Sequence, residues 1–152
     1  MQKHTMAGIL FFSSLLIFSG CGKDDPEKIA EKDREKILEY IAEEGLDAQE
    51  HESGIFYVIE IEGAGGHPTA NSRVKINYTG KLLDGDVFDS NYGASMNLYS
   101  TIQGWQIGIP LFKKGGKGIL IIPSGLGYGQ YPQMGIPANS ILVFDIELVD
   151  YY

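Results

Sequence analysis

Residues 101–109, TIQGWQIGI, contain the only tryptophan of the chain, Trp105. Ile102, Trp105 and Ile109 recur at positions i, i+3 and i+7, which makes one face of a short helix apolar. The segment 110–116, PLFKKGG, ends this helix with a proline and two glycines. A helix this short is not stable alone, so a sheet must hold it. The indole is therefore either the centre of a small α+β core or the floor of an apolar pocket.

The composition limits what kind of protein the chain can be. Its 152 residues are 43% hydrophobic, which suffices for one core, so a single domain with appendages is expected. The 20 glycines, 9 tyrosines and 7 phenylalanines favour strands and turns over a helix bundle. The formal net charge of -8 argues against a nucleic-acid partner, because binding phosphates requires a basic face.

The N-terminus has the pattern of an export signal. Met6–Phe18 is an apolar run, shorter than the roughly 20 residues that span a bilayer but typical of a signal-peptide core. Ser19 and Gly20 then lead into Cys21, the only cysteine of the chain. This arrangement resembles the lipobox of bacterial lipoproteins, although Phe18 stands where that motif usually has an aliphatic residue. The resemblance implies a signal peptide over residues 1–20 and lipidation (palmitate) of Cys21. An ordinary secretory signal with an incidental cysteine is the alternative.

A charged segment follows. Residues 22–52 hold 12 acidic and 5 basic side chains, whereas residues 53–152 hold 8 and 6. The acidic residues just after Cys21 resemble signals that some Gram-negative bacteria use to send lipoproteins to the outer face. We therefore expect a lipid-anchored protein of the cell envelope, in the outer membrane on its periplasmic or surface face. Residues 21–52 are then an acidic tether and helix, and residues 53–152 are the folded domain.

Within the tether, Asp25 followed by Pro26 is a typical helix start and Gly45 is a typical stop, which predicts a helix over residues 26–44. The apolar stripe of this helix is thin: Ile29, Ile37, Tyr40 and Ile41. Such a helix is a spacer, a dimer contact or a lid on the next domain. Because most charge-rich helices are solvated, a spacer is favoured.

The last hundred residues change to the patterns of strands. Alternation of apolar residues, or an apolar run between turn residues, predicts strands over 55–61, 74–78, 117–122 and 140–149. Asp84-Gly85 predicts a hairpin turn within residues 82–88. The last predicted strand has one apolar face, formed by Leu142, Phe144, Ile146 and Leu148, which favours a place in the middle of the sheet.

The sequence offers little to covalent or metal chemistry. One cysteine allows no internal disulfide, and no zinc or iron–sulfur ligand spacing is present. His67 lies beside a proline in a glycine-rich loop without a second ligand or base nearby. Asp84 and Asp86 are explained by turn chemistry and exposure. No metal or cofactor is therefore expected.

Several blocks of sequence occur in the order found in one family. They are INYTG at 76–80, Leu82, DG at 84–85, FDS at 88–90, IQGW at 102–105, GYG at 127–129, IP at 136–137 and LVFDIEL at 142–148. This series resembles the FKBP-type peptidyl-prolyl cis-trans isomerases over residues 53–149. The resemblance implies an α+β fold in which a curved antiparallel sheet wraps around one short helix, here preceded by the charged N-terminal helix.

The resemblance also implies a site between the helix and the sheet. Asp89 would place a carboxylate beside the twisting amide of the substrate and form a hydrogen bond with Tyr78. Tyr128 would donate its hydroxyl to a substrate carbonyl. Asp89, Tyr78 and Tyr128 are the expected catalytic residues. Trp105 would lie under the proline ring, and the backbone N–H of Ile102 would hold the peptide. The expected substrate-binding residues are Phe88, Thr101, Ile102, Trp105, Ile136 and Phe144.

Proline-containing polypeptides, and macrolide immunophilin ligands, are the partners that the family resemblance implies. The expected function is to assist the folding of exported proteins; the alternatives are a non-catalytic chaperone or binding subunit of an envelope complex, and a structural surface lipoprotein. Three places depart from the family pattern. Residues 91–100 predict a short loop, and Met96 stands near the position where many family members have an aromatic residue. Residues 130–135 are irregular, and Ala138 replaces the second proline that is common after Ile-Pro in the family. These departures affect the rim of the pocket.

Overall fold

The computed structural model describes residues 25–152, so the predicted signal peptide and Cys21 lie outside the described residues. In chain order the elements are α1 (Pro26–Glu43), β1 (Gln49–Glu50), β2 (Phe56–Ile61), β3 (Arg73–Lys81), β4 (Val87–Asn97), η1 (Leu98–Ser100), α2 (Gln103–Gly108), η2 (Ile109–Leu111), β5 (Lys117–Ile122), η3 (Ser124–Leu126) and β6 (Leu142–Tyr151). None of the helices within residues 25–152 is long and apolar enough to cross a membrane.

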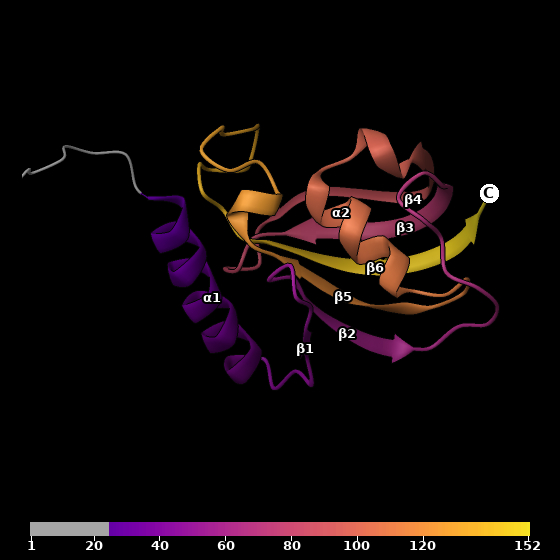
Figure 1. Ribbon diagram of the computed structural model, residues 1–152, viewed down its shortest axis with the longest axis horizontal. Coiled ribbons are helices and arrows are strands. Elements are labelled where there is room, and N and C mark those ends of the chain that lie inside the picture. Colours follow the sequence, from indigo (N-terminus) through magenta and orange to yellow (C-terminus); the bar gives the residue numbers. More distant parts are fainter. Residues whose placement is uncertain (1–24) are drawn as a thin grey trace, which may run out of the picture.

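The six strands form one antiparallel sheet in the order β1-β2-β5-β6-β3-β4. The predicted central position of the last strand is confirmed, since β6 pairs with β5 on one side and β3 on the other. The register of β3 shifts twice against β4, between Ile76 and Tyr78 and between Gly80 and Lys81. Such bulges increase the local twist. The sheet curves so that α2 lies against one of its faces (Figure 1).

The predicted hairpin between β3 and β4 is also confirmed. Gly85 has φ of +90°, a conformation that glycine adopts without strain, and its N–H donates to the Leu82 carbonyl over 3.0 Å. The Asp84 carboxylate accepts a hydrogen bond from the Asp86 N–H at 3.1 Å. Asp84 therefore serves the turn, as expected from its place in the sequence.

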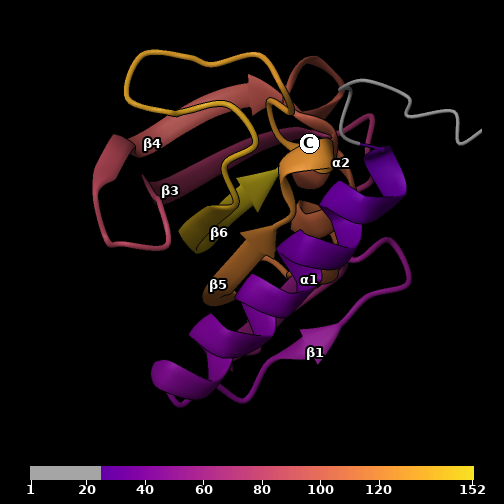
Figure 2. The same ribbon diagram turned by 90° about the vertical axis from the view of Figure 1, so that its left-hand side faces the viewer.

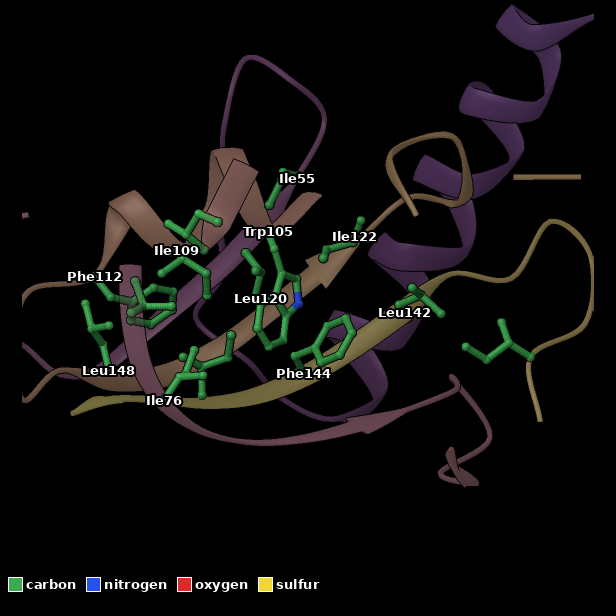
Figure 3. Packing of buried hydrophobic residues seen from close by; sticks show 14 residues of the cluster. Ile55, Ile76, Trp105, Ile109, Phe112, Leu120, Ile122, Leu142, Phe144 and Leu148 are labelled. Atoms are coloured by element: carbon green, nitrogen blue, oxygen red, sulfur yellow. The ribbon is translucent and has the colours of Figure 1, made fainter. Parts of the chain in front are cut away.

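The main core lies between α2 and the sheet (Figure 3). Ile109, Phe112 and Leu120 have at most 1% of their surface exposed, and Trp105 has 4%. The alternation along β6 sends Leu142, Phe144, Ile146 and Leu148 into this core. The sequence prediction of a short apolar helix held by a sheet is thus confirmed, and the helix itself spans only six residues, Gln103–Gly108.

Two glycines bring α2 close to β5. A Cβ atom on Gly108 would lie 2.5 Å from Cδ1 of Leu120, and a Cβ atom on Gly104 would overlap the side chain of Ile122. Both isoleucine and leucine side chains are fully buried, so neither can move aside freely. The glycine of the IQGW block and the glycine that ends α2 therefore set the distance between helix and sheet.

We expect Gly108→Ala to lower the free energy of unfolding by about 1–3 kcal/mol, the usual cost of overfilling a close-packed core. Urea unfolding followed by Trp105 fluorescence measures the change. Gly125→Ala is the matched control, because a Cβ atom there would meet nothing within 4 Å. Equal stabilities for the two variants would show that α2 can shift away from β5 without cost.

The helix α1 packs against the sheet, so the favoured interpretation of it as a solvated spacer is wrong. Ile37 is fully buried and packs with Phe56, Ile121, Ile141 and Val143, which lie on the face of the sheet opposite α2. Figure 2 views the molecule from the side where α1 lies against the sheet. The guanidinium of Arg34 also donates two hydrogen bonds of 2.8 Å to Glu50 of β1. A thin apolar stripe is enough here, because it meets the apolar outer face of three strands.

The predicted short loop over residues 91–100 is also wrong. Strand β4 continues to Asn97 and pairs with β3 along its length, with Asn97 opposite Arg73. Only η1 then separates it from the stretch that leads into α2. Most side chains of this edge strand are exposed, and they are mainly polar. The strand therefore lacks the alternation of apolar residues by which strands are predicted from sequence.

Candidate active site

A cavity of about 400 Å³ opens between α2, β3, β4 and the start of β6. It is lined by Tyr78, Phe88, Asp89, Met96, Ser100, Thr101, Ile102, Trp105, Tyr128 and Phe144. All the predicted catalytic residues are in this set, and so are all the predicted binding residues except one. Tyr78 and Phe144 are 66 positions apart in the chain, and they meet here because β3 and β6 are neighbours in the sheet.

Four aromatic rings form the walls, and they touch edge to face. The ring of Phe144 lies 5.3 Å from that of Trp105, 5.6 Å from Phe88 and 6.3 Å from Tyr78, measured between centroids. The Tyr78 and Trp105 rings are 5.0 Å apart at 88°. Edge-to-face packing stabilises each pair of rings by more than the burial of their surface alone. The rings therefore hold one another in place and keep the cavity open and apolar.

Gly80 makes room for two of these rings. It lies opposite Phe144 in β6, and a Cβ atom on it would come within 2.6 Å of the Phe88 ring and 2.8 Å of the Phe144 ring. No other residue type fits there without moving a pocket wall. This explains the glycine that ends the INYTG block.

The floor of the cavity is the indole of Trp105. It is 4% exposed, and its Nε1–H has no hydrogen-bond partner among the residues that the structure describes. An indole N–H is normally paired when buried. The rings of Tyr78 and Phe144 lie against the indole, and together these aromatic faces give the cavity an apolar surface. Of the two roles that the sequence left open, Trp105 takes both: it belongs to the core and it lines the pocket.

One strong polar contact lies at the edge of the cavity. The hydroxyl of Tyr78 donates a hydrogen bond to Oδ2 of Asp89 over 2.6 Å, a length typical of a bond to a charged acceptor. Burial, and then this bond to Asp89, raise the pKa of Tyr78 well above its usual value, so the hydroxyl stays protonated over the neutral range. The Asp89 carboxylate is exposed on its other side and points a negative charge to the cavity.

Two further polar residues of the lining, Tyr128 and Thr101, lie outside the regular helices and strands. Tyr128 is 36% exposed and sits in the turn after η3, where Gly129 has φ of +55°. Thr101 donates its hydroxyl to the Leu98 carbonyl at 2.7 Å, which fixes the stretch before α2. Ile102 is the N-cap residue directly before α2, and its carbonyl accepts the N–H of Trp105 at 3.0 Å.

The predicted rim residue Ile136 does not line the cavity. It is 5% exposed and belongs to the main core cluster. It was expected among the binding residues only because the family resemblance implies that role for the isoleucine of the IP block. Met96 and Ser100 do line the cavity. Met96 was noted as a departure from the family pattern, whereas Ser100 carries no signal in the sequence that would have singled it out.

No cluster of three or more metal-binding side chains occurs within residues 25–152. His67 lies outside the cavity lining, with its Nδ1 2.9 Å from the carbonyl oxygen of Pro110. What the described pocket offers is an apolar slot with a tyrosine–carboxylate pair and a second tyrosine at its edge. Such an arrangement can bind a small apolar ring and an adjacent amide.

Comparisons with known proteins place the chain in a family. Residues 65–149, more than half of the chain, match the family model for the FKBP-type peptidyl-prolyl cis-trans isomerases. The chain therefore belongs to the FKBP-type peptidyl-prolyl cis-trans isomerase family, a family of enzymes, as the ordered sequence blocks indicated. The predicted FKBP-like fold is confirmed in the same way by solved structures of similar proteins.

Three similar proteins illustrate the match. The isomerase FkpA of Buchnera aphidicola subsp. Schizaphis graminum is 47% identical over 103 residues, which cover 64% of this chain and 41% of that protein. The crystal structure of FkpA from Escherichia coli is 37% identical with a TM-score of 0.71, covering 82% of this chain and 62% of that one. A peptidyl-prolyl cis-trans isomerase from Pseudomonas syringae pv. tomato is 33% identical with a TM-score of 0.72, covering 86% and 98%.

The chain spans about half the length of the curated relatives that it matches, from 41% of the Buchnera protein to 56% of a probable isomerase of Haemophilus influenzae. The P. syringae structure, by contrast, is covered over 98% of its length. The match to the P. syringae structure therefore extends to residues before 65 of this chain and takes in nearly all of the P. syringae chain.

Proposed function

We propose that this protein catalyses the cis-trans isomerisation of X–Pro bonds in polypeptides, and that it assists the folding of exported proteins. The observation that supports this most directly is the aromatic pocket with Trp105 as its floor and the Tyr78–Asp89 pair at its edge. Its volume of about 400 Å³ suits a proline ring with its neighbouring amide. Family membership supports the same function.

Rotation about an X–Pro bond is slow because it disrupts amide resonance, with a barrier of about 20 kcal/mol. The twisted amide is less dipolar than the planar one, so an apolar slot favours the twisted form. In our proposal the proline ring lies on Trp105 between Phe88 and Phe144. Proton transfer has no part in this reaction, and the described pocket needs no nucleophile.

The polar groups would orient the substrate. We assign Tyr128 as the donor to a substrate carbonyl, and the backbone N–H of Ile102 as a second contact to the peptide. Asp89 places its charge beside the amide as the carbonyl turns, while Tyr78 holds that carboxylate in place. Thr101 forms the edge of the slot. Catalysis then results from differential binding of the twisted amide.

A protease-coupled assay on short X–Pro peptides tests this function. We expect turnover with a rate that is nearly independent of pH between about 6 and 9, since a mechanism without proton transfer lacks the acid and base limbs of a bell-shaped profile. His67→Ala should leave the rate unchanged, because His67 lies outside the pocket. A bell-shaped profile would contradict the mechanism.

Absence of turnover, together with a change in Trp105 fluorescence on adding a prolyl peptide, would support the non-catalytic binding module instead. The fluorescence signal is specific because Trp105 is the only tryptophan. The same titration with a macrolide tests the proposed immunophilin ligands. Met96 and Ser100 line the pocket, so affinity for a rigid macrolide is expected to depend on them.

We further propose that the protein is anchored in the cell envelope, in the outer membrane, through lipid on Cys21 after removal of residues 1–20. The apolar run before Cys21 and the acidic residues after it support this. Residues 21–52 would then join the anchor to the isomerase domain of residues 53–152, with α1 resting on that domain.

Cys21→Ser is expected to move the protein from the membrane fraction to the soluble fraction, because the variant has no site for acylation. Fractionation of cells followed by immunoblotting measures the shift, and labelled palmitate should enter the wild type only. A serine variant that stays with the membrane, and a wild type without label, would overturn the anchor.

A further inference from the structure

The helix α1 and the turn that carries Tyr128 are joined by a buried polar contact. Asp33 of α1 is 3% exposed, and Ser124 at the start of η3 is fully buried. One carboxylate oxygen of Asp33, Oδ2, accepts the backbone N–H of Ser124 at 2.8 Å and its hydroxyl at 2.6 Å. A buried carboxylate is costly unless it is hydrogen-bonded, so these two bonds fix the place of Ser124 relative to α1.

Ser124 in turn holds the backbone on both sides of Tyr128. Its carbonyl accepts the N–H of Gly127 at 3.0 Å and the N–H of Gly129 at 2.9 Å. The carbonyl of Gly129 then accepts the N–H of Asn139 at 2.6 Å. Tyr128 thus lies between two amides that bond the same carbonyl. Once Ser124 is fixed, the backbone that presents the Tyr128 side chain has little freedom.

The interface between α1 and this turn is partly hollow. A groove of about 700 Å³ lies between them, with Pro26, Ile29 and Ala30 on the helix side and Leu126 and Gln130 on the other. Asp33 and Ser124 belong to the wall of this groove. Where side chains do not fill an interface, dispersion contributes little. The hydrogen-bonded pair is a buried link between the first half of α1 and the turn.

We propose that Asp33 is a positioning residue for the isomerase: through Ser124, it holds the turn that presents the Tyr128 hydroxyl to the pocket. This rests on the proposed function, which gives Tyr128 its contact with the substrate. Asp33 lies outside residues 65–149, the part that matches the family model. The helix before the shared domain then contributes to catalysis without touching the substrate.

The kinetic test uses Asp33→Ala and Tyr128→Phe, singly and together, in the full chain. We expect Asp33→Ala to lower kcat/KM about three- to tenfold, the range for losing one ordinary hydrogen bond, and by no more than Tyr128→Phe does. In the Tyr128→Phe background the same change should cost less than about twofold, since the hydroxyl through which it acts is gone. A purely structural role would give equal losses in both backgrounds and would overturn the proposal.

Two matched variants separate positioning from packing and charge. Ile37→Val weakens the packing of α1 on the sheet, and Glu35→Gln removes an exposed charge from the same helix. Both should keep wild-type kcat/KM. If Asp33→Ala does not fold, Asp33→Asn replaces it, because Asn keeps the shape and one acceptor oxygen; its loss should be smaller and in the same direction.

Amide hydrogen exchange tests the link without any activity. The amides of Gly127 and Gly129 should exchange at least about tenfold faster in Asp33→Ala, while that of Leu120 in β5 stays protected. Unchanged protection of both glycine amides would overturn the proposal even if activity fell. A wild type without turnover would sink the proposed function, and exchange at Gly127 and Gly129 would still decide whether Asp33 holds the turn.

Discussion

Replacing Phe144 with alanine is expected to lower the free energy of unfolding by about 3–5 kcal/mol, the usual cost of truncating a buried phenylalanine. Phe144 is 4% exposed and touches three other rings of the pocket, those of Tyr78, Phe88 and Trp105. The loss should also reduce kcat/KM by about tenfold or more, because a wall of the proline slot disappears and water enters it. Urea unfolding and the peptide assay measure the two effects.

The neighbouring residue in β6 provides the control. Val143 is fully buried but belongs to the outer cluster under α1, on the other face of the sheet. Val143→Ala should therefore destabilise the protein yet leave kcat/KM of the folded fraction close to wild type. Equal losses of activity in Phe144→Ala and Val143→Ala would show that activity depends on general stability, and the assignment of the pocket would fail.

Asp89→Ala is expected to show the opposite of Val143→Ala. It should lower kcat/KM by about tenfold or more and change the free energy of unfolding by about 1 kcal/mol or less. The Asp89 side chain is exposed, so removing it leaves no cavity in the core. It does leave the Tyr78 hydroxyl without the acceptor that lies 2.6 Å away. The peptide assay and urea unfolding, carried out on the same samples, separate the two quantities.

Asp89→Asn should retain part of the activity, since an amide oxygen still accepts from Tyr78 but carries no charge. Asp86→Ala removes a similar exposed carboxylate from the adjacent hairpin, outside the pocket lining, and should behave as wild type. If Asp86→Ala lost as much activity as Asp89→Ala, the effect would come from the net charge of this edge, and the role of the Tyr78–Asp89 bond would be refuted.

The elements that decide the fold could be predicted because their patterns are strong. The strand over 117–122 was predicted with the bounds that β5 has, since a proline and two glycines delimit an apolar run. The place of β6 in the middle of the sheet is predicted by its apolar face. The pocket residues, by contrast, came from the ordered family blocks, because no periodicity brings Asp89 and Phe144 together.

The sequence predictions that the structure contradicts share a physical cause. Each depends on which part of the fold a segment packs against, and a sequence pattern does not show this. The 26–44 helix looked solvated because a sequence shows its four apolar residues but not the apolar sheet that receives them. Strand β4 looked like a loop because an edge strand keeps one row of backbone groups unpaired and most of its side chains exposed. The binding role of Ile136 is implied by the family pattern alone, and in this structure Ile136 is buried in the main core cluster and does not line the cavity.

The packing of α1 has a practical consequence for anyone who prepares this protein. A recombinant fragment that starts at Ser53, where the family resemblance begins, would leave Phe56, Ile121, Ile141 and Val143 uncovered on the outside of the sheet. Apolar side chains gathered on one surface promote self-association. A fragment that starts at Asp25 keeps the first helix as a cover, so it should be soluble where the shorter one precipitates.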